Sequence, residues 1–196
     1  MNFNDFKAMY IILCICFGLA ALTPVLSMLI RLPVGERFSE MWILGPKHLA
    51  EDYPFNVLRG SNYTVYVSVS NHMGNSMYYA VYVKFRNQTE QLPNVTRQTP
   101  SPLPAIYEYR FVVLDGETWE TKISFSFDFK NASLIRSLTI DNTTVIVNKP
   151  ARWDSENKGY YYQLFFELWI YDADDASFRF HNRFVGIWLN MSSISE

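Results

Sequence analysis

The sequence predicts an all-β fold, an immunoglobulin-like β-sandwich ectodomain, preceded by one N-terminal transmembrane α-helix. Three observations support this prediction. The segment Ala8–Ile30 contains 23 residues and no charge. Short segments of alternating apolar and polar residues follow it, and such a period of two is typical of half-buried strands. Aromatic residues make up 17% of the chain, and strands favour aromatic side chains.

The apolar segment is long enough to cross a bilayer. A helix rises about 1.5 Å per residue, so about 20 apolar residues span a hydrocarbon core of about 30 Å. We therefore expect a short cytoplasmic tail at 1–7, a span at 8–30 in contact with the lipid bilayer, a stalk at 31–39 and an extracytoplasmic domain at 40–196. The alternative is a signal peptide cleaved near Ala20-Ala21, although the apolar run continues well past these residues.

Cys14 and Cys16 are the only cysteines, and both lie inside the apolar segment. In that position they are expected to pack as small apolar side chains. The external domain therefore has no disulfide and depends on its hydrophobic core for stability.

The first strands follow from the alternation of residues. A strand is expected around Glu40–Leu44, followed by a loop at Lys47–Asn56. Alternation in Tyr63–Asn71 and from Met77 to Phe85 predicts two more strands. The segment Asn71–Ser76 has turn residues, so the two strands are expected to form an antiparallel hairpin.

The segment 87–105 interrupts this pattern because it is rich in Pro and Thr. A loop of this length is uncommon inside a compact domain and is expected to be mobile or functional. Two interpretations remain open, a solvated loop that carries glycans and a loop that contacts a partner.

The remaining strands have short turns between them. They are expected at Tyr107–Leu114, Trp119–Phe129, Ser137–Ile140, Thr144–Val147, Tyr160–Tyr171 and Phe178–Asn190. A tight hairpin is expected at Asp141–Thr143 and a turn at Asp172–Ser177. Tyr160–Tyr171 is apolar on both faces, which predicts a central strand covered on both sides. About eight or nine strands with short turns favour a two-sheet sandwich.

Six Asn-X-Ser/Thr sequons all lie beyond the apolar segment, and they predict N-linked glycans. Lys7 on one side and Arg31 on the other do not decide the orientation by the positive-inside rule. The sequons do, because glycans require the C-terminal domain to be outside the cell membrane. The predicted glycosylation sites are Asn62, Asn87, Asn94, Asn131, Asn142 and Asn190.

Several motifs occur in order along the external domain. They are Leu44-Gly45-Pro46, Glu51-Asp52-Tyr53-Pro54, a glycine-led strand at Gly60 and Asn71-His72. The set resembles the opening of the archaeal domain-of-unknown-function family 1616, and the segments 112–127 and 165–191 resemble its closing strands. The resemblance implies a membrane-anchored, outward-facing β domain and supplies no activity. Members of that family often carry several membrane helices, and an acidic residue usually follows the asparagine-histidine turn, where this chain has Met73.

No catalytic motif stands out in the sequence. It contains no nucleophile elbow, no paired-histidine zinc motif and no phosphate-binding glycine loop. The three histidines are far apart in sequence, and Asp172–Asp175 lacks the glycine and bidentate glutamate of a calcium loop. The net charge of −2 and the absence of a basic cluster argue against nucleic acid. We therefore expect a protein that is not an enzyme and that has no cofactor and no metal.

A surplus of aromatic residues lies opposite the predicted core positions. The candidate interaction surface consists of Tyr66, Tyr78, Tyr82, Tyr161 and Trp169, and Phe165 shares this pattern. These residues either pack in a second layer or form a surface that contacts a partner or a sugar.

The favoured function is a single-pass membrane protein that acts as a non-enzymatic interaction or accessory subunit of a cell-envelope or membrane complex, with other membrane or envelope proteins as partners. The alternatives are a module that binds envelope glycans or solutes, and a secreted filament subunit released by signal cleavage.

Overall fold

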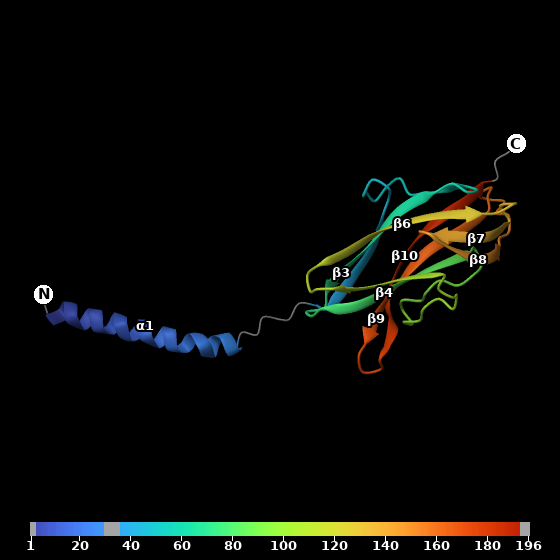
Figure 1. Ribbon diagram of the computed structural model, residues 1–196. Coiled ribbons are helices and arrows are strands. Elements are labelled where there is room, and N and C mark those ends of the chain that lie inside the picture. Colours follow the sequence, from blue (N-terminus) through green and yellow to red (C-terminus); the bar gives the residue numbers. More distant parts are fainter. Residues whose placement is uncertain (1–2, 30–35, 193–196) are drawn as a thin grey trace. The chain divides into compact units, whose positions relative to one another are not determined.

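The computed structural model describes residues 3–29 and 36–192, and the chain divides into two units, 1–37 and 38–196. The first unit contains the helix α1 (Phe3–Leu29), and the second contains the strands (Figure 1). No helix in the described part of the chain combines the length and hydropathy needed to cross a membrane. The beginning of the predicted tail, the last residue of the predicted span, most of the predicted stalk and the last four residues lie outside the described residues.

The second unit is a sandwich of two five-stranded sheets, which confirms the predicted β-rich architecture. The first sheet has the order β1 (Phe38–Leu44), β3 (Tyr63–His72), β6 (Thr118–Asp128), β7 (Leu134–Ile140) and β8 (Thr143–Pro150). The second has the order β2 (Asn56–Leu58), β10 (Ser177–Ser192), β9 (Tyr161–Asp172), β4 (Met77–Asn87) and β5 (Tyr107–Val113). Neighbouring strands are antiparallel except β2 and β10, which are parallel.

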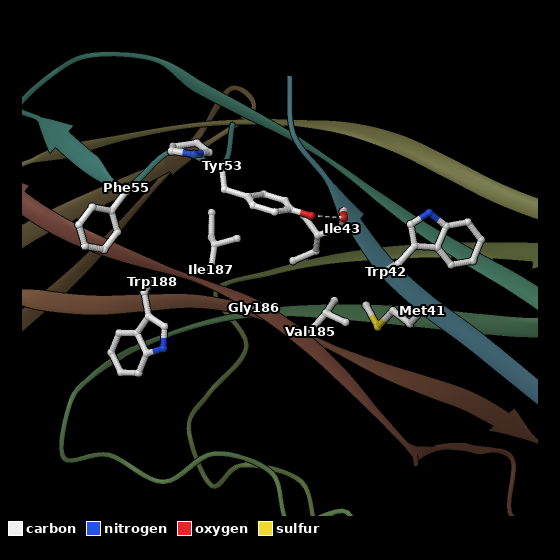
Figure 2. Close-up of a pocket in the computed structure, with 10 residues that line it drawn as sticks. Met41, Trp42, Ile43, Tyr53, Phe55, Val185, Gly186, Ile187 and Trp188 are labelled. Carbon is white, nitrogen blue, oxygen red and sulfur yellow. Dashed lines mark hydrogen bonds between the residues drawn. The ribbon is translucent and has the colours of Figure 1, made fainter. Parts of the chain in front are cut away.

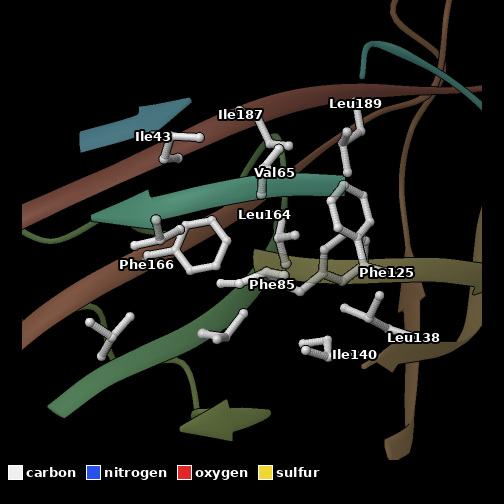
Figure 3. Close-up of a cluster of buried hydrophobic side chains, with 14 of the residues drawn as sticks. Ile43, Val65, Phe85, Phe125, Leu138, Ile140, Leu164, Phe166, Ile187 and Leu189 are labelled. Atoms are coloured by element: carbon white, nitrogen blue, oxygen red, sulfur yellow. The ribbon is translucent and has the colours of Figure 1, made fainter. Parts of the chain in front are cut away.

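The hydrophobic core lies between the two sheets (Figure 3). Alternate residues point inward, so each strand contributes every second side chain to the core. Phe85 of the second sheet packs against Phe127 of the first, with ring centroids 5.3 Å apart. Phe125, Phe166 and many aliphatic side chains are almost completely buried around them. Burial of apolar area contributes roughly 25 cal/mol per Å2, so this layer is the main source of stability in a domain without a disulfide.

Two hairpins and the central strand agree with the sequence prediction. β7 and β8 pair with Ile140 opposite Thr143, so two residues form the turn, and Asp141 adopts a positive φ of 51°. β9 and β10 pair across the turn after Asp172. β9 lies in the middle of the second sheet and is buried on both faces, as its apolar sequence predicted.

The predicted hairpin of Tyr63–Asn71 and Met77–Phe85 is wrong. β3 pairs with β1 and β6 in the first sheet, whereas β4 pairs with β5 and β9 in the second. The chain therefore crosses from one sheet to the other between these strands. Both strands turn one face towards the core, each from its own sheet. Paired strands of a hairpin would show the same alternation of apolar and polar residues, so the sequence pattern does not separate the two arrangements. The three-residue strand β2 was also missed, because it lies at the end of the predicted loop at Lys47–Asn56 and is too short to show a period.

Asn71 holds the crossing between β3 and β4. Its side-chain Nδ2 donates to the carbonyl oxygens of Asn75 and Val113, at 2.8 and 2.9 Å, and its Oδ1 accepts from the backbone N–H of Met73. Gly74 follows with a positive φ of 80°, a conformation that suits glycine. One buried side chain thus satisfies several backbone groups of the turn, as buried polar groups require.

A polar network continues from Asn71 across the sandwich. The Tyr79 hydroxyl donates to Asn71 Oδ1 at 3.1 Å and lies 2.6 Å from Ser39 Oγ, which lies 3.0 Å from His181 Nε2. Because the Tyr79 hydroxyl gives its only hydrogen to Asn71, the Tyr79 oxygen accepts from the Ser39 hydroxyl. The Ser39 oxygen in turn accepts from the Nε2–H of His181. Burial, and then the nearby Arg183 and Arg179, lower the pKa of His181 to about 4, so the imidazole is neutral near pH 7.

This shift predicts a pH-dependent stability. The unfolded chain protonates His181 below a pKa of about 6.5, whereas the folded chain resists protonation down to about 4. The contribution of neutral His181 is therefore complete above pH 6.5 and is lost as the pH falls from about 6.5 to about 4. Denaturant unfolding of the wild type and of His181→Gln should show a difference in stability that shrinks across this window. A difference that stays constant from pH 7 to pH 4 would contradict the assignment.

Candidate functional site

The outer face of the second sheet carries two neighbouring clusters of aromatic side chains, contributed by β4, β9 and β10. One contains Tyr78, Tyr171 and Phe178, the other contains Tyr82, Trp169 and Phe180, and we name the two together the aromatic face. Tyr78 lies between Tyr171 and Phe178, with centroid distances of 5.7 and 5.0 Å. Trp169 contacts Tyr82 at 5.0 Å and Phe180 at 6.1 Å. The rings therefore pack within each cluster, across adjacent strands.

The aromatic face is open to solvent at one end. Tyr78 and Tyr171 are each 37% exposed, unlike the aromatic residues of the core. The Arg110 guanidinium lies 5.3 Å from the centroid of Phe178 and also pairs with Glu108 at 2.9 Å. Exposed aromatic residues next to an arginine are typical of surfaces that bind other molecules.

The structure brings together three of the five residues that the sequence singled out. Tyr78, Tyr82 and Trp169 belong to the aromatic face. Tyr161 points to the same side of the sheet but lies at the opposite end of β9, where its ring is 6.0 Å from Phe55. Tyr66 lies on the first sheet, where its ring is tilted against the ring of His48, with the centroids 3.7 Å apart.

A buried ion pair lies in the middle of the same outer face. Lys84 Nζ lies 2.8 Å from Glu167 Oε2, and the two side chains are 5% and 0% exposed. The backbone N–H of Ser101 donates to Glu167 Oε1, and the Ser101 carbonyl accepts from Lys84 Nζ, both at 2.8 Å. Trp169 Nε1 also donates to Glu167 at 3.0 Å. The long loop thus supplies the partners that two buried charges require.

The loop at 87–105 has further contacts that hold it against the sandwich. Ser101 Oγ donates to the Gln91 carbonyl at 2.7 Å, and Lys149 pairs with Glu90 at 2.6 Å. Arg86 donates to the Glu90 carbonyl. These contacts show that the expected solvated loop is wrong around Ser101, which is buried over the sheet. The central part of the loop, Asn94–Thr99, is exposed, as a solvated loop would be.

A pocket lies at the edge of the sandwich, between β1 and β10 (Figure 2). This pocket of about 520 Å3 is mostly apolar and is lined by Met41, Trp42, Ile43, Tyr53, Pro54, Phe55, Val185, Gly186, Ile187 and Trp188. The Tyr53 hydroxyl donates to the Ile43 carbonyl at 2.8 Å, so the ring is fixed across the pocket. Gly186 also lines the pocket, and a Cβ at this position would come within 2.8 Å of Phe165 Cβ.

A neighbouring pocket of about 460 Å3 shares Phe55 and Trp188 with the first. Its other lining residues are Gln88, Asp154, Asn157 and Tyr161. We call the two pockets together the edge groove. Asp154 accepts from the side chain and the backbone N–H of Asn157, and these hydrogen bonds lower the pKa of Asp154. The carboxylate is therefore ionised at neutral pH.

Trp42, Phe55 and Trp188 were not predicted as site residues from the sequence. Trp42 and Trp188 were expected to lie in strands, and Phe55 in a loop. The Tyr53-Pro54 motif before Phe55 was the available signal, since it places an aromatic pair in a constrained loop next to the first strand.

The sequons differ in their surroundings. Asn62, Asn94, Asn131 and Asn142 are exposed. Asn87 is half-buried and donates through Nδ2 to the Pro150 carbonyl at 2.8 Å, and Asn190 donates to Asn56 Oδ1 at 3.2 Å. The exposed four have the solvent access that an N-linked glycan requires. Glycosylation of all six stays a prediction.

Within the described residues, no three His, Cys, Asp or Glu side chains form a group that could hold a metal ion.

The family model of a domain of unknown function, DUF1616, matches residues 32–135, which is more than half of the chain. The chain belongs to the DUF1616 family. The match includes the motifs at Gly45, Tyr53 and Asn71 and the segment 112–127, whereas the segment 165–191 lies beyond it. No curated protein sequence matches this chain.

Several solved structures have a distantly similar arrangement. A chain from the complex of Zinc 2-glycoprotein and Prolactin inducible protein from human seminal plasma is 10% identical, with a TM-score of 0.38, 81% of this chain and 98% of that chain covered. The β-glucosidase from Listeria innocua is 9% identical, with a TM-score of 0.37, 79% of this chain and 16% of that chain covered. The ASH/PapD-like domain of human CEP192 is 8% identical, with a TM-score of 0.32, 81% of this chain and 86% of that chain covered.

The structure gives a physical role to the DUF1616 motifs. Gly45 has no room for a side chain, because a Cβ would lie 2.0 Å from the Glu51 carbonyl oxygen. Tyr53 anchors its loop to Ile43, and Asn71 organises the crossing between the sheets. The motifs therefore maintain the loops beside β1 and β4.

The buried ion pair predicts an asymmetric response to mutation. Glu167→Gln keeps the shape of the side chain but leaves the Lys84 ammonium without its counter-charge, so it should destabilise the domain by about 3–5 kcal/mol. The double variant Lys84→Met/Glu167→Leu removes both charges and should cost less than the sum of the two single substitutions. Urea unfolding measures this on the wild type, Glu167→Gln, the double variant and its two single variants, Lys84→Met and Glu167→Leu. A loss below about 0.5 kcal/mol for Glu167→Gln would contradict the role of the pair.

Proposed function

We propose that this protein is a single-pass membrane protein whose immunoglobulin-like sandwich is a non-enzymatic interaction or accessory subunit of a cell-envelope or membrane complex. The aromatic face is the observation that carries the proposal. It spans three adjacent strands, and the exposed ends of Tyr78 and Tyr171 lie next to Phe178. Large apolar surfaces are rarely left open on soluble monomers, so exposed aromatic rings gathered on one face of a sheet favour a binding partner.

The composition of the aromatic face fits a protein partner. Interfaces are enriched in Tyr, Trp, Phe and Arg, and a few such side chains near the centre contribute most of the binding energy. Arg110 lies over Phe178 at the border, so the partner is expected to offer an apolar centre with an acceptor group near this guanidinium. Val112, which is 63% exposed and opposite Tyr78 in the strand register, extends the apolar surface onto β5.

The proposed location rests on the sequence. The 23 uncharged residues of Ala8–Ile30 have the length of a membrane span, and all six sequons follow them. The solvent exposure of Asn62, Asn94, Asn131 and Asn142 supports the placement of the sandwich outside the membrane, where glycans are attached.

The immunoglobulin-like assignment rests on strand order. In an immunoglobulin domain one sheet contains strands A, B, E and D, and the other contains C, F and G. Here β1 and β3 take the positions of A and B, and β4, β9 and β10 take those of C, F and G. The chain differs at β6, β7 and β8, which follow one another in space and in sequence, where an immunoglobulin domain reverses the order of D and E.

Site-specific crosslinking tests the proposal. A photoreactive residue placed at Tyr82 of the full chain, activated in native membranes, should give a covalent adduct with one defined polypeptide. The same residue placed at Tyr66, on the other sheet, is the matched control and should give no such adduct. The double variant Tyr82→Ala/Tyr171→Ala should lose the stoichiometric partner that the wild type retains in mild detergent. Recovery of the wild type as a monomer without an adduct would contradict the proposal.

A further inference from the structure

We propose that the edge groove binds a neutral oligosaccharide. This inference goes beyond the proposed function, because the edge groove and the aromatic face are different surfaces. It rests on the shape of the edge groove, on its fixed aromatic rings and on the polar groups beside them.

The edge groove has the form of an extended site. Its two pockets, of about 520 and about 460 Å3, adjoin at Phe55 and Trp188, which line both. It runs from Trp42 on β1 to Asn157 in the turn before β9. Pockets of this size accommodate small ligands, and two adjoining pockets suit a ligand of several linked sugar rings.

The walls of the edge groove present exposed aromatic rings. Phe55 is 47% exposed, Trp188 41% and Tyr53 36%, although all three lie in a concave region. Aromatic faces carry a negative quadrupole that attracts weakly positive hydrogens. The C–H groups on one face of a pyranose ring match this requirement, so the rings provide platforms on which a sugar can stack.

The platforms are held in place before a ligand binds. The Tyr53 hydroxyl donates to the Ile43 carbonyl, and the Tyr161 hydroxyl donates to the Asn157 carbonyl at 2.6 Å. The buried Arg86 guanidinium lies over the Trp188 ring, 5.2 Å from its centroid, and supports it from one side. Because these side chains are already ordered, little conformational entropy is lost when a ligand binds.

The polar groups indicate a neutral ligand with hydroxyl groups. Gln88, Asp154 and Asn157 line one pocket and offer amide and carboxylate groups for sugar hydroxyls. No lysine, arginine or histidine is among the residues that line either pocket. The ionised Asp154 carboxylate would repel an acidic sugar, so the charge pattern favours an uncharged one.

The sugar can come from two sources, a free oligosaccharide or a glycan on the chain itself. Asn190 follows Trp188 by two residues on β10, so both side chains point to the same face of the strand. A glycan attached at Asn190 would therefore start beside the edge groove. Protein made without N-glycosylation separates the two sources, because only free oligosaccharides can then bind.

Isothermal titration calorimetry on the unglycosylated full chain in mild detergent tests the inference. The probes are cello-, manno- and N-acetylchito-oligosaccharides, with oligogalacturonate as the acidic comparison. At least one neutral probe should bind, and Trp188→Ala and Phe55→Ala should each weaken it by about tenfold or more. Trp188→Tyr should retain part of the affinity, because it keeps an aromatic face. Phe38→Ala, at a similarly exposed aromatic residue on β1 outside both surfaces, is the matched control and should bind like the wild type.

Each outcome of these measurements either supports or overturns the inference. If Trp188→Ala fails to fold, as judged by its thermal melt, Phe55→Ala gives the same answer from a loop position. If glycosylated protein binds the probe only after Asn190→Gln, the inferred site is confirmed and its natural occupant is the chain's own glycan. Absence of binding by every neutral probe, tighter binding of oligogalacturonate, or unchanged affinity in both alanine variants would overturn the inference.

Discussion

The buried ion pair between Lys84 and Glu167 is the contact on which the outer face of the second sheet depends. Both side chains point away from the main core, where a sandwich normally meets solvent, and yet both are almost completely buried. The backbone of Ser101 lies over them and pairs with each charge. The loop at 87–105 is consequently a third layer over part of the sheet, and the aromatic face lies beside it.

The residues around Ser101 suit this role. Pro100 and Pro102 flank it, and their rings restrict the backbone at Ser101 in the unfolded chain as well as in the folded one. Less conformational entropy is therefore lost when the loop docks. A buried ion pair contributes little net stability by itself, but leaving either charge unpaired is costly. The pair thus fixes where the loop lies around Ser101, and so it fixes the border of the aromatic face, where Trp169 donates to Glu167.

Much of the architecture was predictable from local pattern. Alternation identified β3, β4, β6 and most of β10, and the doubly apolar segment Tyr160–Tyr171 identified the central strand β9. The pairing of β3 was not predictable, because opposition across the core and pairing within a hairpin give the same alternation. Three of the five predicted surface aromatics came together on the aromatic face, since they occupy the alternate positions of β4 and β9 that point away from the core. The ion pair of Lys84 and Glu167 was not predictable, because an isolated charge at an outward position of a strand is usually solvated. The pocket at Phe55 and Trp188 was not predictable either, because these residues are far apart in sequence and meet only in the tertiary fold.

Hydrogen exchange in the segment 100–104 tests the central claim most directly. Proline has no amide hydrogen, so Ser101 and Leu103 carry the only two exchangeable backbone amides in this segment. The Ser101 amide donates to buried Glu167, and the Leu103 amide donates to Ser101 Oγ. Mass spectrometry of a peptide that covers this segment should show exchange as slow as in β9. Exchange of the Ser101 amide at the rate of an exposed, unstructured peptide would show that the loop is not held over the ion pair, and the account would fail.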